Sequence, residues 1–125
     1  MNAPLPPDEA QRLRSLRDYN VLDTPPEAEF DELSSLAALI CQTPVALISF
    51  VDESRQWFKS HHGLQVQETP RDLAFCAYAI LQKDTVMEVP DAQADPRFAE
   101  NVLVTAAPHI RFYAGAPLIN RKSVV

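Results

Sequence analysis

The first clear pattern along the chain is a pair of leucines at helical spacing. Leu13 and Leu16 lie about one turn apart among arginine, serine and aspartate residues, and Asp8 stands before them as a suitable N-cap. This spacing predicts a helix that begins after Asp8. Its apolar stripe is narrow, which favours contact with a partner over a place in a deep core.

A second helix is predicted in TPPEAEFDELSSLAALI, residues 24–40. Thr24 and Glu27 have the spacing of a capping box, and Pro25 stands at the first helical position, where its missing N–H costs nothing. Pro44 ends the pattern. One apolar face is expected from Phe30, Leu33, Leu36, Ala37 and Ile40.

Two strands and a short loop are predicted next. PVALISFV, residues 44–51, is apolar on both faces, which indicates a central, covered strand. Asp52 to Arg55 has the length of a hairpin loop, and QWFKSHH, residues 56–62, continues as a second strand. Alternation along it predicts one face with Trp57, Lys59 and His61 and another with Phe58, Ser60 and His62.

A third helix is predicted after Thr69 and Pro70, with Asp72 as a further start signal. Its apolar positions at helical spacing are Leu73, Cys76, Ala77, Ile80 and Leu81. The pattern places Cys76 in the middle of a buried stripe.

The last third of the chain is predicted to hold a strand, a short helix and another strand. TVMEV, residues 85–89, indicates a strand, and DPRFAEN, residues 95–101, a short helix with Asp95 as cap and Pro96 at its first position. The final strand is expected over residues 110–119. Its core face would hold Ile110, Phe112, Ala114, Ala116 and Leu118, and its polar face Arg111, Tyr113 and Gly115.

A turn is expected over residues 120–123, with Val124 and Val125 as the start of another strand. This order of elements predicts an α+β fold in which helices pack on an antiparallel sheet. Residues 1–7 are expected to form a flexible N-terminus and residues 8–125 a single domain. The length of 125 residues suits one domain, and 46% apolar and 22% charged residues are typical of globular proteins.

Charge and cysteine content argue against several classes of protein. The formal net charge of -6 opposes binding to nucleic acid or anionic lipid, and no basic cluster offsets it. No apolar run has the length of a signal peptide or a membrane span, so we expect no membrane insertion and a cytoplasmic location. Cys41 and Cys76 form no CxxC pair, which predicts reduced thiols.

Cys76 is the main candidate for chemistry, and three interpretations of it stay open. It can be a small core residue, a wall of a ligand pocket, or a reactive thiol, which needs a nearby cation or base and access to solvent. His61 and His62 are neighbours in a strand, point to opposite faces and cannot share one metal ion. We therefore predict neither a metal site nor a catalytic group.

Arg111 and Tyr113 are expected to project beside Gly115, whose missing side chain lets a ligand or another backbone approach. These residues can line a pocket. Alternatively, Arg111 pairs with a carboxylate such as Asp91, and Tyr113 covers the sheet. Trp57 is open to similar alternatives, a pocket wall or packing in the core or an interface.

Five phrases in order resemble one family: LDTPPEAEFDEL, PVALISFVDESRQWFKS, ETPRDLAFCAYAI, VPDAQADPRF and PHIRFYAGAPL. Between Leu13 and Leu118 they are similar to the GAF sensory domain, in the form found N-terminally in bacterial sensor histidine kinases and diguanylate cyclases. The resemblance implies a PAS-related central antiparallel sheet, with the N-terminal helices on one face and loops and short helices roofing a small-molecule pocket on the other. It implies a ligand-binding site bordered by Phe75, Cys76, Tyr78, Asp91, Arg97, Phe98, Arg111 and Tyr113. Trp57 is added to these candidates from its own place in the sequence, not from the resemblance.

The resemblance also implies a regulatory function. An unknown small molecule or a partner would shift the flanking helices of a homodimer, formed through the N-terminal helices or an exposed sheet edge, and so control an output domain. One alternative is a dimerisation module whose pocket has degenerated. A more distant one is a thiol redox enzyme of the free methionine sulfoxide reductase type, whose cysteine pattern Cys41 and Cys76 do not match. The FCAYAI context lacks the motif that attaches a bilin.

Members of the family continue beyond the GAPLI segment into further strands and a helix that leads to the effector. By this resemblance the sequence lacks the last strand or strands and the helix. We therefore expect a fragment, a truncated product or a self-associating dimer with an unpaired strand edge.

Overall fold

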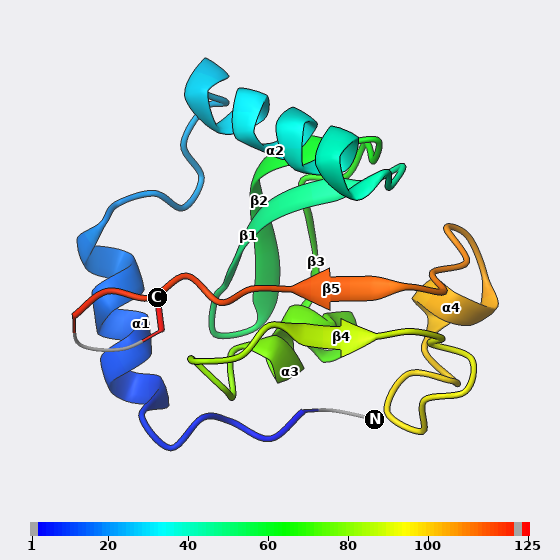
Figure 1. Ribbon diagram of the computed structural model, residues 1–125. Coiled ribbons are helices and arrows are strands. Elements are labelled where there is room, and N and C mark those ends of the chain that lie inside the picture. Colours follow the sequence, from blue (N-terminus) through cyan, green and yellow to red (C-terminus); the bar gives the residue numbers. More distant parts are fainter. Residues whose placement is uncertain (1–2, 122–123) are drawn as a thin grey trace.

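The computed structural model describes residues 3–121 and 124–125 and confirms an α+β fold (Figure 1). The strands form two antiparallel sheets, one with the order β1-β2-β3 and one that pairs β4 with β5. Among the described residues, no helix is long and apolar enough to cross a membrane. In chain order the elements are α1 (Glu9–Asp18), α2 (Ala28–Cys41), β1 (Ala46–Val51), β2 (Arg55–His62), β3 (Glu68–Pro70), the 3-10 helix η1 (Arg71–Leu73), α3 (Cys76–Ala79), β4 (Met87–Val89), α4 (Val102–Thr105) and β5 (Tyr113–Gly115).

Two predicted segments lie partly outside the described residues. These are the flexible N-terminus, of which residues 1 and 2 are not described, and the turn at 120–123, of which residues 122 and 123 are not described. Among the described residues near that segment, Ile119 and Val124 form an antiparallel bridge, and the Val125 N–H donates to the Leu118 carbonyl at 2.9 Å.

The two N-terminal helices begin without the capping contacts that the sequence predicts. Asp8 precedes α1, but its side chain makes no capping hydrogen bond. Helix α2 begins only at Ala28, after Glu27 in an extended conformation. The prediction of a capping box formed by Thr24 and Glu27 is therefore wrong. The Thr24 hydroxyl donates to the Val21 carbonyl instead, and Glu27 pairs with a lysine of β2.

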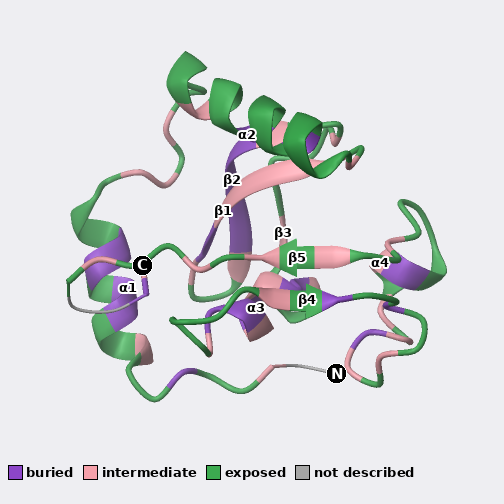
Figure 2. Ribbon diagram, viewed as in Figure 1, coloured by how far each residue is buried: buried purple, intermediate pink, exposed green. Residues whose placement is uncertain are grey.

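The buried side of α2 consists of two small residues, one polar and one apolar, so the predicted apolar core face is wrong. Ser34 and Ala38 are buried, and the Ser34 hydroxyl lies 2.7 Å from that of Ser60 in β2. Ser60 also donates to Asp31 Oδ1 at 2.7 Å. These hydrogen bonds turn the apolar stripe outward, and most of α2 is exposed in Figure 2. Phe30 is half-buried and Ala37 exposed, and the exposed fractions are 57% for Leu33, 49% for Leu36, 75% for Leu39 and 71% for Ile40.

The predicted hairpin of β1 and β2 is present, but a β-bulge interrupts the alternation along β2. Ile48 pairs with Ser60 and the next residue, Ser49, pairs with Phe58, so Lys59 is the extra residue. Because of the extra residue, the Lys59 and Ser60 side chains both reach α2 and the segment before it. The prediction that these two side chains face opposite ways is wrong for this reason.

Lys59 is buried, and the segment between α1 and α2 satisfies its ammonium group. Nζ donates to the Thr24 hydroxyl and to the Pro25 carbonyl, each at 2.7 Å, and forms an ion pair with Glu27 at 2.7 Å. An ammonium group has three donors, and here each has an acceptor. The contacts fix the α1–α2 segment on β2.

The third helix, predicted after Thr69 and Pro70, is broken into η1 and α3. Ala74 has an extended backbone, with φ −81° and ψ 123°, and separates the two pieces. The side-chain amide of Asn101 donates to the Leu73 carbonyl at 3.1 Å and holds this break. Cys76 therefore begins a short helix instead of lying within a long apolar stripe.

The last third of the chain contains shorter elements than predicted. Residues 95–101 form turns instead of a helix, and α4 follows with Asn101 as its N-cap. The strand predicted at 110–119 narrows to β5. Of its predicted core face, Ile110 packs against the buried residues around Phe75, but the prediction is wrong for the other four, which are exposed: Phe112, Ala114, Ala116 and Leu118. Phe112 is 52% exposed, whereas Tyr113 points into the molecule, where it packs on Phe75. Strand β3 was not predicted.

Replacement of Lys59 by methionine removes the donors that the Thr24 hydroxyl and the Pro25 carbonyl accept from. We expect the free energy of unfolding, measured by urea denaturation, to fall by about 1–3 kcal/mol. Lys83→Met, at an exposed position, is the control and should change it by less than about 0.5 kcal/mol. An unchanged stability for Lys59→Met would show that this ammonium group does not fix the α1–α2 segment.

Candidate functional site

Four of the predicted site residues form an aromatic cluster: Phe75, Tyr78, Phe98 and Tyr113. The Phe75 and Phe98 rings are stacked, with centroids 4.1 Å apart and planes 3° from parallel. Tyr78 meets Phe98 edge-on at 5.2 Å, and Tyr113 tilts against Phe75, also at 5.2 Å. These are favourable arrangements for aromatic pairs. The buried neighbours of the aromatic cluster are Val89, Ala92 and Val104.

Arg97 covers one side of the aromatic cluster. Its guanidinium carbon lies 5.0 Å from the Phe98 centroid and 5.4 Å from that of Tyr78, within the range of cation–π contacts. Asp95 holds it in place through bonds of 3.0 Å from Nε and 2.7 Å from Nη2. The hydrogen bonds from Arg97 hold the pKa of the Asp95 carboxyl below its ordinary value. The positive charge of Arg97 is thus balanced by the Asp95 carboxylate.

Cys76 lies at the inner side of the aromatic cluster, where it makes two polar contacts. Its Sγ is 3.1 Å from the Tyr113 hydroxyl and 3.4 Å from Ser49 Oγ of β1. Burial, together with the neighbouring Cys76, raises the pKa of the Tyr113 phenol. A neutral phenol beside a half-buried thiol favours the interpretation of Cys76 as a wall residue over that of a nucleophile.

Gly115 leaves room for the Tyr113 side chain, which folds over it. A Cβ atom at Gly115 would lie 2.1 Å from the Tyr113 hydroxyl oxygen, far inside van der Waals contact. The close approach that the sequence suggests at Gly115 is therefore made by a side chain of the same strand.

The remaining three predicted site residues make their contacts with groups other than the four rings of the aromatic cluster. Trp57 packs with Leu16 of α1 and Phe50 of β1. Asp91 Oδ1 accepts from the backbone N–H of Gln93 at 3.0 Å, and the side chain of Arg111 donates to the Val104 carbonyl at 3.0 Å. Among the described residues no ion pair joins Asp91 to Arg111, so the alternative that Arg111 pairs with Asp91 is not supported. A ligand-binding role for the nine residues stays a prediction.

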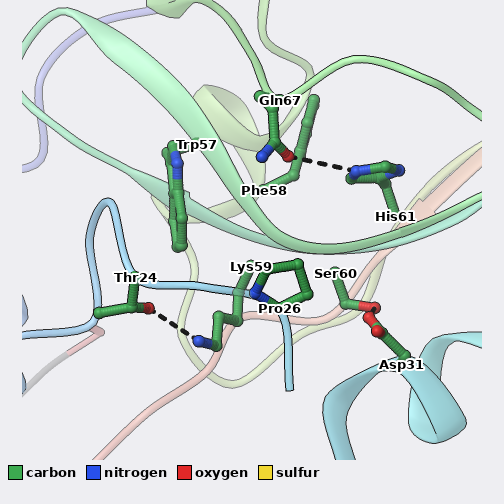
Figure 3. A pocket seen from close by; sticks show the side chains of 9 residues that line it. All are labelled: Thr24, Pro26, Asp31, Trp57, Phe58, Lys59, Ser60, His61 and Gln67. Atoms are coloured by element: carbon green, nitrogen blue, oxygen red, sulfur yellow. Dashed lines mark hydrogen bonds between the residues drawn. The ribbon is translucent and has the colours of Figure 1, made fainter. Parts of the chain in front are cut away.

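A cavity of about 130 Å³ lies elsewhere, between β2 and the segment before α2 (Figure 3). Trp57, Pro26 and His61 are among its walls. Sites for small molecules commonly have about 300–1,000 Å³. In Figure 3 the Lys59 amine turns to Thr24, and His61 Nε2 lies 3.2 Å from Gln67 Oε1. This cavity is small, and much of its polar lining is already hydrogen-bonded within the chain.

Two residues of the candidate site were not predicted as members of it. Asp95 was interpreted only as a helix cap, but it holds Arg97. Ser49 lies in an apolar run, and its contact with Cys76 joins residues 27 positions apart, which the sequence does not reveal. The closeness of Asp95 and Arg97, two positions apart in the sequence, is the signal that could have indicated their pairing.

The chain belongs to the GAF domain family, whose pattern it matches over residues 25–125. This agrees with the α+β fold and with the resemblance found in the sequence. GAF domains are regulatory sensory domains of signalling proteins, and this chain is a domain of that kind.

One relative is the cyclic di-GMP phosphodiesterase PA2567 of Pseudomonas aeruginosa (strain PAO1). The two are 48% identical over 115 residues, which cover 92% of this chain and 19% of the relative. The chain thus spans about a fifth of the length of the curated relative that it matches.

Replacement of Gly115 by alanine tests the packing of Tyr113. The added Cβ forces the Tyr113 hydroxyl away from Cys76, so we expect the free energy of unfolding to fall by about 1–3 kcal/mol. In a Cys41→Ser background, labelling of the Cys76 thiol should also become faster. Ala114→Ser, at the exposed neighbour, is the control. Unchanged stability and labelling of Gly115→Ala would contradict the proposed packing.

Proposed function

We propose that this chain is a non-catalytic regulatory module that controls cyclic di-GMP hydrolysis. The observation that carries the proposal is its 48% identity to a segment covering 19% of a cyclic di-GMP phosphodiesterase. A segment of that size, matched to a sensory family, acts on the remainder of such a protein and does not perform its chemistry. The histidine kinase and cyclase outputs suggested by the sequence have no comparable support.

We further propose that a small molecule provides the signal by binding at the aromatic cluster. Supporting this is the combination of a planar apolar stack with one partly exposed cation, Arg97, whose side chain is 39% exposed. Most pockets for small molecules are apolar, with a few polar groups that fix orientation. Because Phe75 and Phe98 now fill the space, binding requires their rings to separate. Ligand affinity for the opened state then sets the size of the signal.

The regulatory role is tested in the relative itself. This chain is exchanged for the matching segment of the Pseudomonas phosphodiesterase, and cyclic di-GMP hydrolysis is compared with that of the parent and of a deletion. We expect deletion to change the rate by about fivefold or more and the exchange to restore it to within about twofold. The isolated chain should not hydrolyse cyclic di-GMP.

The matched variants of that hybrid are Phe98→Ala, which opens the aromatic cluster, and Lys83→Met, which is exposed and lies outside it. Phe98→Ala should behave like the deletion, and Lys83→Met like the parent. A hybrid that behaves like the deletion would refute the regulatory role. A Phe98→Ala hybrid indistinguishable from the parent would refute a role of the aromatic cluster in it.

A second candidate function is dimerisation without a ligand. It is favoured by the filled aromatic cluster and by the apolar surface of α2, where Leu36, Leu39 and Ile40 are exposed. An exposed apolar face of this kind is typical of surfaces that another protein covers. A second copy of the chain would bury both stripes in one helix pair.

Sedimentation of the purified chain tests dimerisation. We expect twice the monomer mass of 14.0 kDa, and a return to the monomer mass in the double variant Leu36→Glu/Ile40→Glu. The control is Val86→Glu, which places the same charge at a residue 55% exposed outside α2. A wild-type chain that sediments as a monomer at high micromolar concentration would exclude this candidate.

A further inference from the structure

Glu9 of α1 lies between two guanidinium groups. Its Oε1 accepts from Arg12 Nε at 2.8 Å, and its Oε2 accepts from Arg71 Nη1 at 2.5 Å. Burial alone would raise the pKa of the Glu9 carboxyl, but the bonds from Arg12 and Arg71 outweigh it and hold the pKa below its ordinary value. The exposed fraction is 14% for the Glu9 side chain and 11% for that of Arg71, so the group is largely shielded from water.

Arg12 is bound to Glu9 by one nitrogen only. Its side chain is 0% exposed, and neither Nη1 nor Nη2 has a hydrogen-bond partner among residues 3–121 and 124–125. Buried donors without acceptors are costly. The guanidinium group is a planar fork that can hold both oxygens of one carboxylate, as Arg97 holds Asp95 in this molecule. Arg12 therefore has unused capacity to bind Glu9 more strongly.

Arg71 connects the Glu9 carboxylate to the segment that leads into the aromatic cluster. Its Nη1 also donates to the Asp52 carbonyl at 3.0 Å, and its backbone N–H donates to the Ser54 carbonyl at 3.0 Å. Arg71 is the first residue of η1, and the chain reaches Phe75 and Cys76 directly after it. The Glu9–Arg71 ion pair is thus a direct polar contact between α1 and the segment from which two predicted site residues project.

We propose that Glu9 is a two-position link between α1 and the aromatic cluster segment. In the position seen here, Glu9 bridges Arg12 and Arg71 and holds η1 against α1. In the second position, Arg71 withdraws with η1, and Glu9 binds Arg12 with both oxygens, Oε1 on Nε as here and Oε2 on one of the two Nη nitrogens. Each position pairs the Glu9 charge, so the link is a discrete two-state element of the kind that can couple distant sites.

The link adds a route by which the proposed signal would reach α1. Its existence does not depend on the proposed function, but its role in signalling does. Separation of the aromatic rings on ligand binding would move residues 71–75 and withdraw Arg71. Helix α1 would keep its own ion pair with Arg12 but lose its tie to η1. The orientation of α1 would then report the state of the aromatic cluster.

Amide hydrogen exchange of the 125-residue chain tests the link without any ligand. Exchange is followed in α1 and in residues 71–80. We expect Arg71→Ala to accelerate exchange in residues 71–80 by about tenfold, which corresponds to about 1.4 kcal/mol, and to leave α1 within about twofold of the wild type. Glu9→Gln weakens both ion pairs, so it should accelerate exchange in both segments.

The double variant Arg71→Ala/Arg12→Lys tests the second position. Lysine lacks the planar fork, so α1 should lose the protection that it keeps in Arg71→Ala. The matched controls are Arg14→Ala and Glu29→Gln, which are exposed and should leave both segments unchanged. Circular dichroism checks that each variant folds. If a Glu9 or Arg12 variant fails to fold, Arg71→Ala alone still decides.

Two results would overturn the proposal. Unchanged exchange of residues 71–80 in Arg71→Ala would mean that Glu9 does not hold this segment. Loss of α1 protection in Arg71→Ala by more than about twofold would mean that Glu9 has no second position on Arg12. Either result leaves the outcome of the phosphodiesterase hybrid untouched, so failure of the link and failure of the regulatory role are distinguishable.

Discussion

The buried ammonium group of Lys59 is the constraint on which the helical layer depends. A charged group inside a protein must have partners, and those of Lys59 are a hydroxyl, a carbonyl and a carboxylate of residues 24–27. This segment lies against β2 to supply them, and α2 begins only at Ala28, after Glu27 in an extended conformation. Ser60, next to the bulge, then fixes the rotation of α2 through Ser34. The outward turn of the leucines follows from this attachment.

The β1–β2 hairpin is the wall shared by the two sides of the molecule. Phe50 packs with Trp57 and Leu16 of α1, whereas its neighbour Ser49 contacts Cys76 on the other face. Val51 continues that second face towards Ile80. Cys76, which contacts Tyr113 of the aromatic cluster, and helix α1 therefore touch opposite faces of β1. A displacement at either face alters packing against the same backbone, which is the physical basis for communication between them.

The sequence predicts local patterns well and long-range partners poorly. Helix α1 and the β1–β2 hairpin could be predicted because residue spacing alone defines them. The break at Ala74 could not, since the amide of Asn101, far along the chain, holds it. The rotation of α2 depends in the same way on a bulge that leaves no mark in the alternation of β2.

The candidate site shows the same division between local and long-range information. Family resemblance named Phe75, Tyr78, Phe98 and Tyr113, which the fold brings together. It also named Asp91 and Arg111, whose side chains bind nearby backbone groups instead. The role of Asp95 as counterion to Arg97 requires the turn at 95–98, which a helical interpretation of the same residues conceals.

A closed aromatic cluster is compatible with sensing because the cost of opening it is modest. Separating one aromatic pair costs about 0.5–1.5 kcal/mol, and exposing one buried ring about 1.5–3 kcal/mol more. An opened state higher by a few kcal/mol is populated at about 0.1–10%, a fraction that a selective ligand can raise. A ligand or partner that binds both states equally shifts nothing, however tightly it binds. The stacking of Phe75 on Phe98 therefore sets the threshold that any signal acting at this site must exceed.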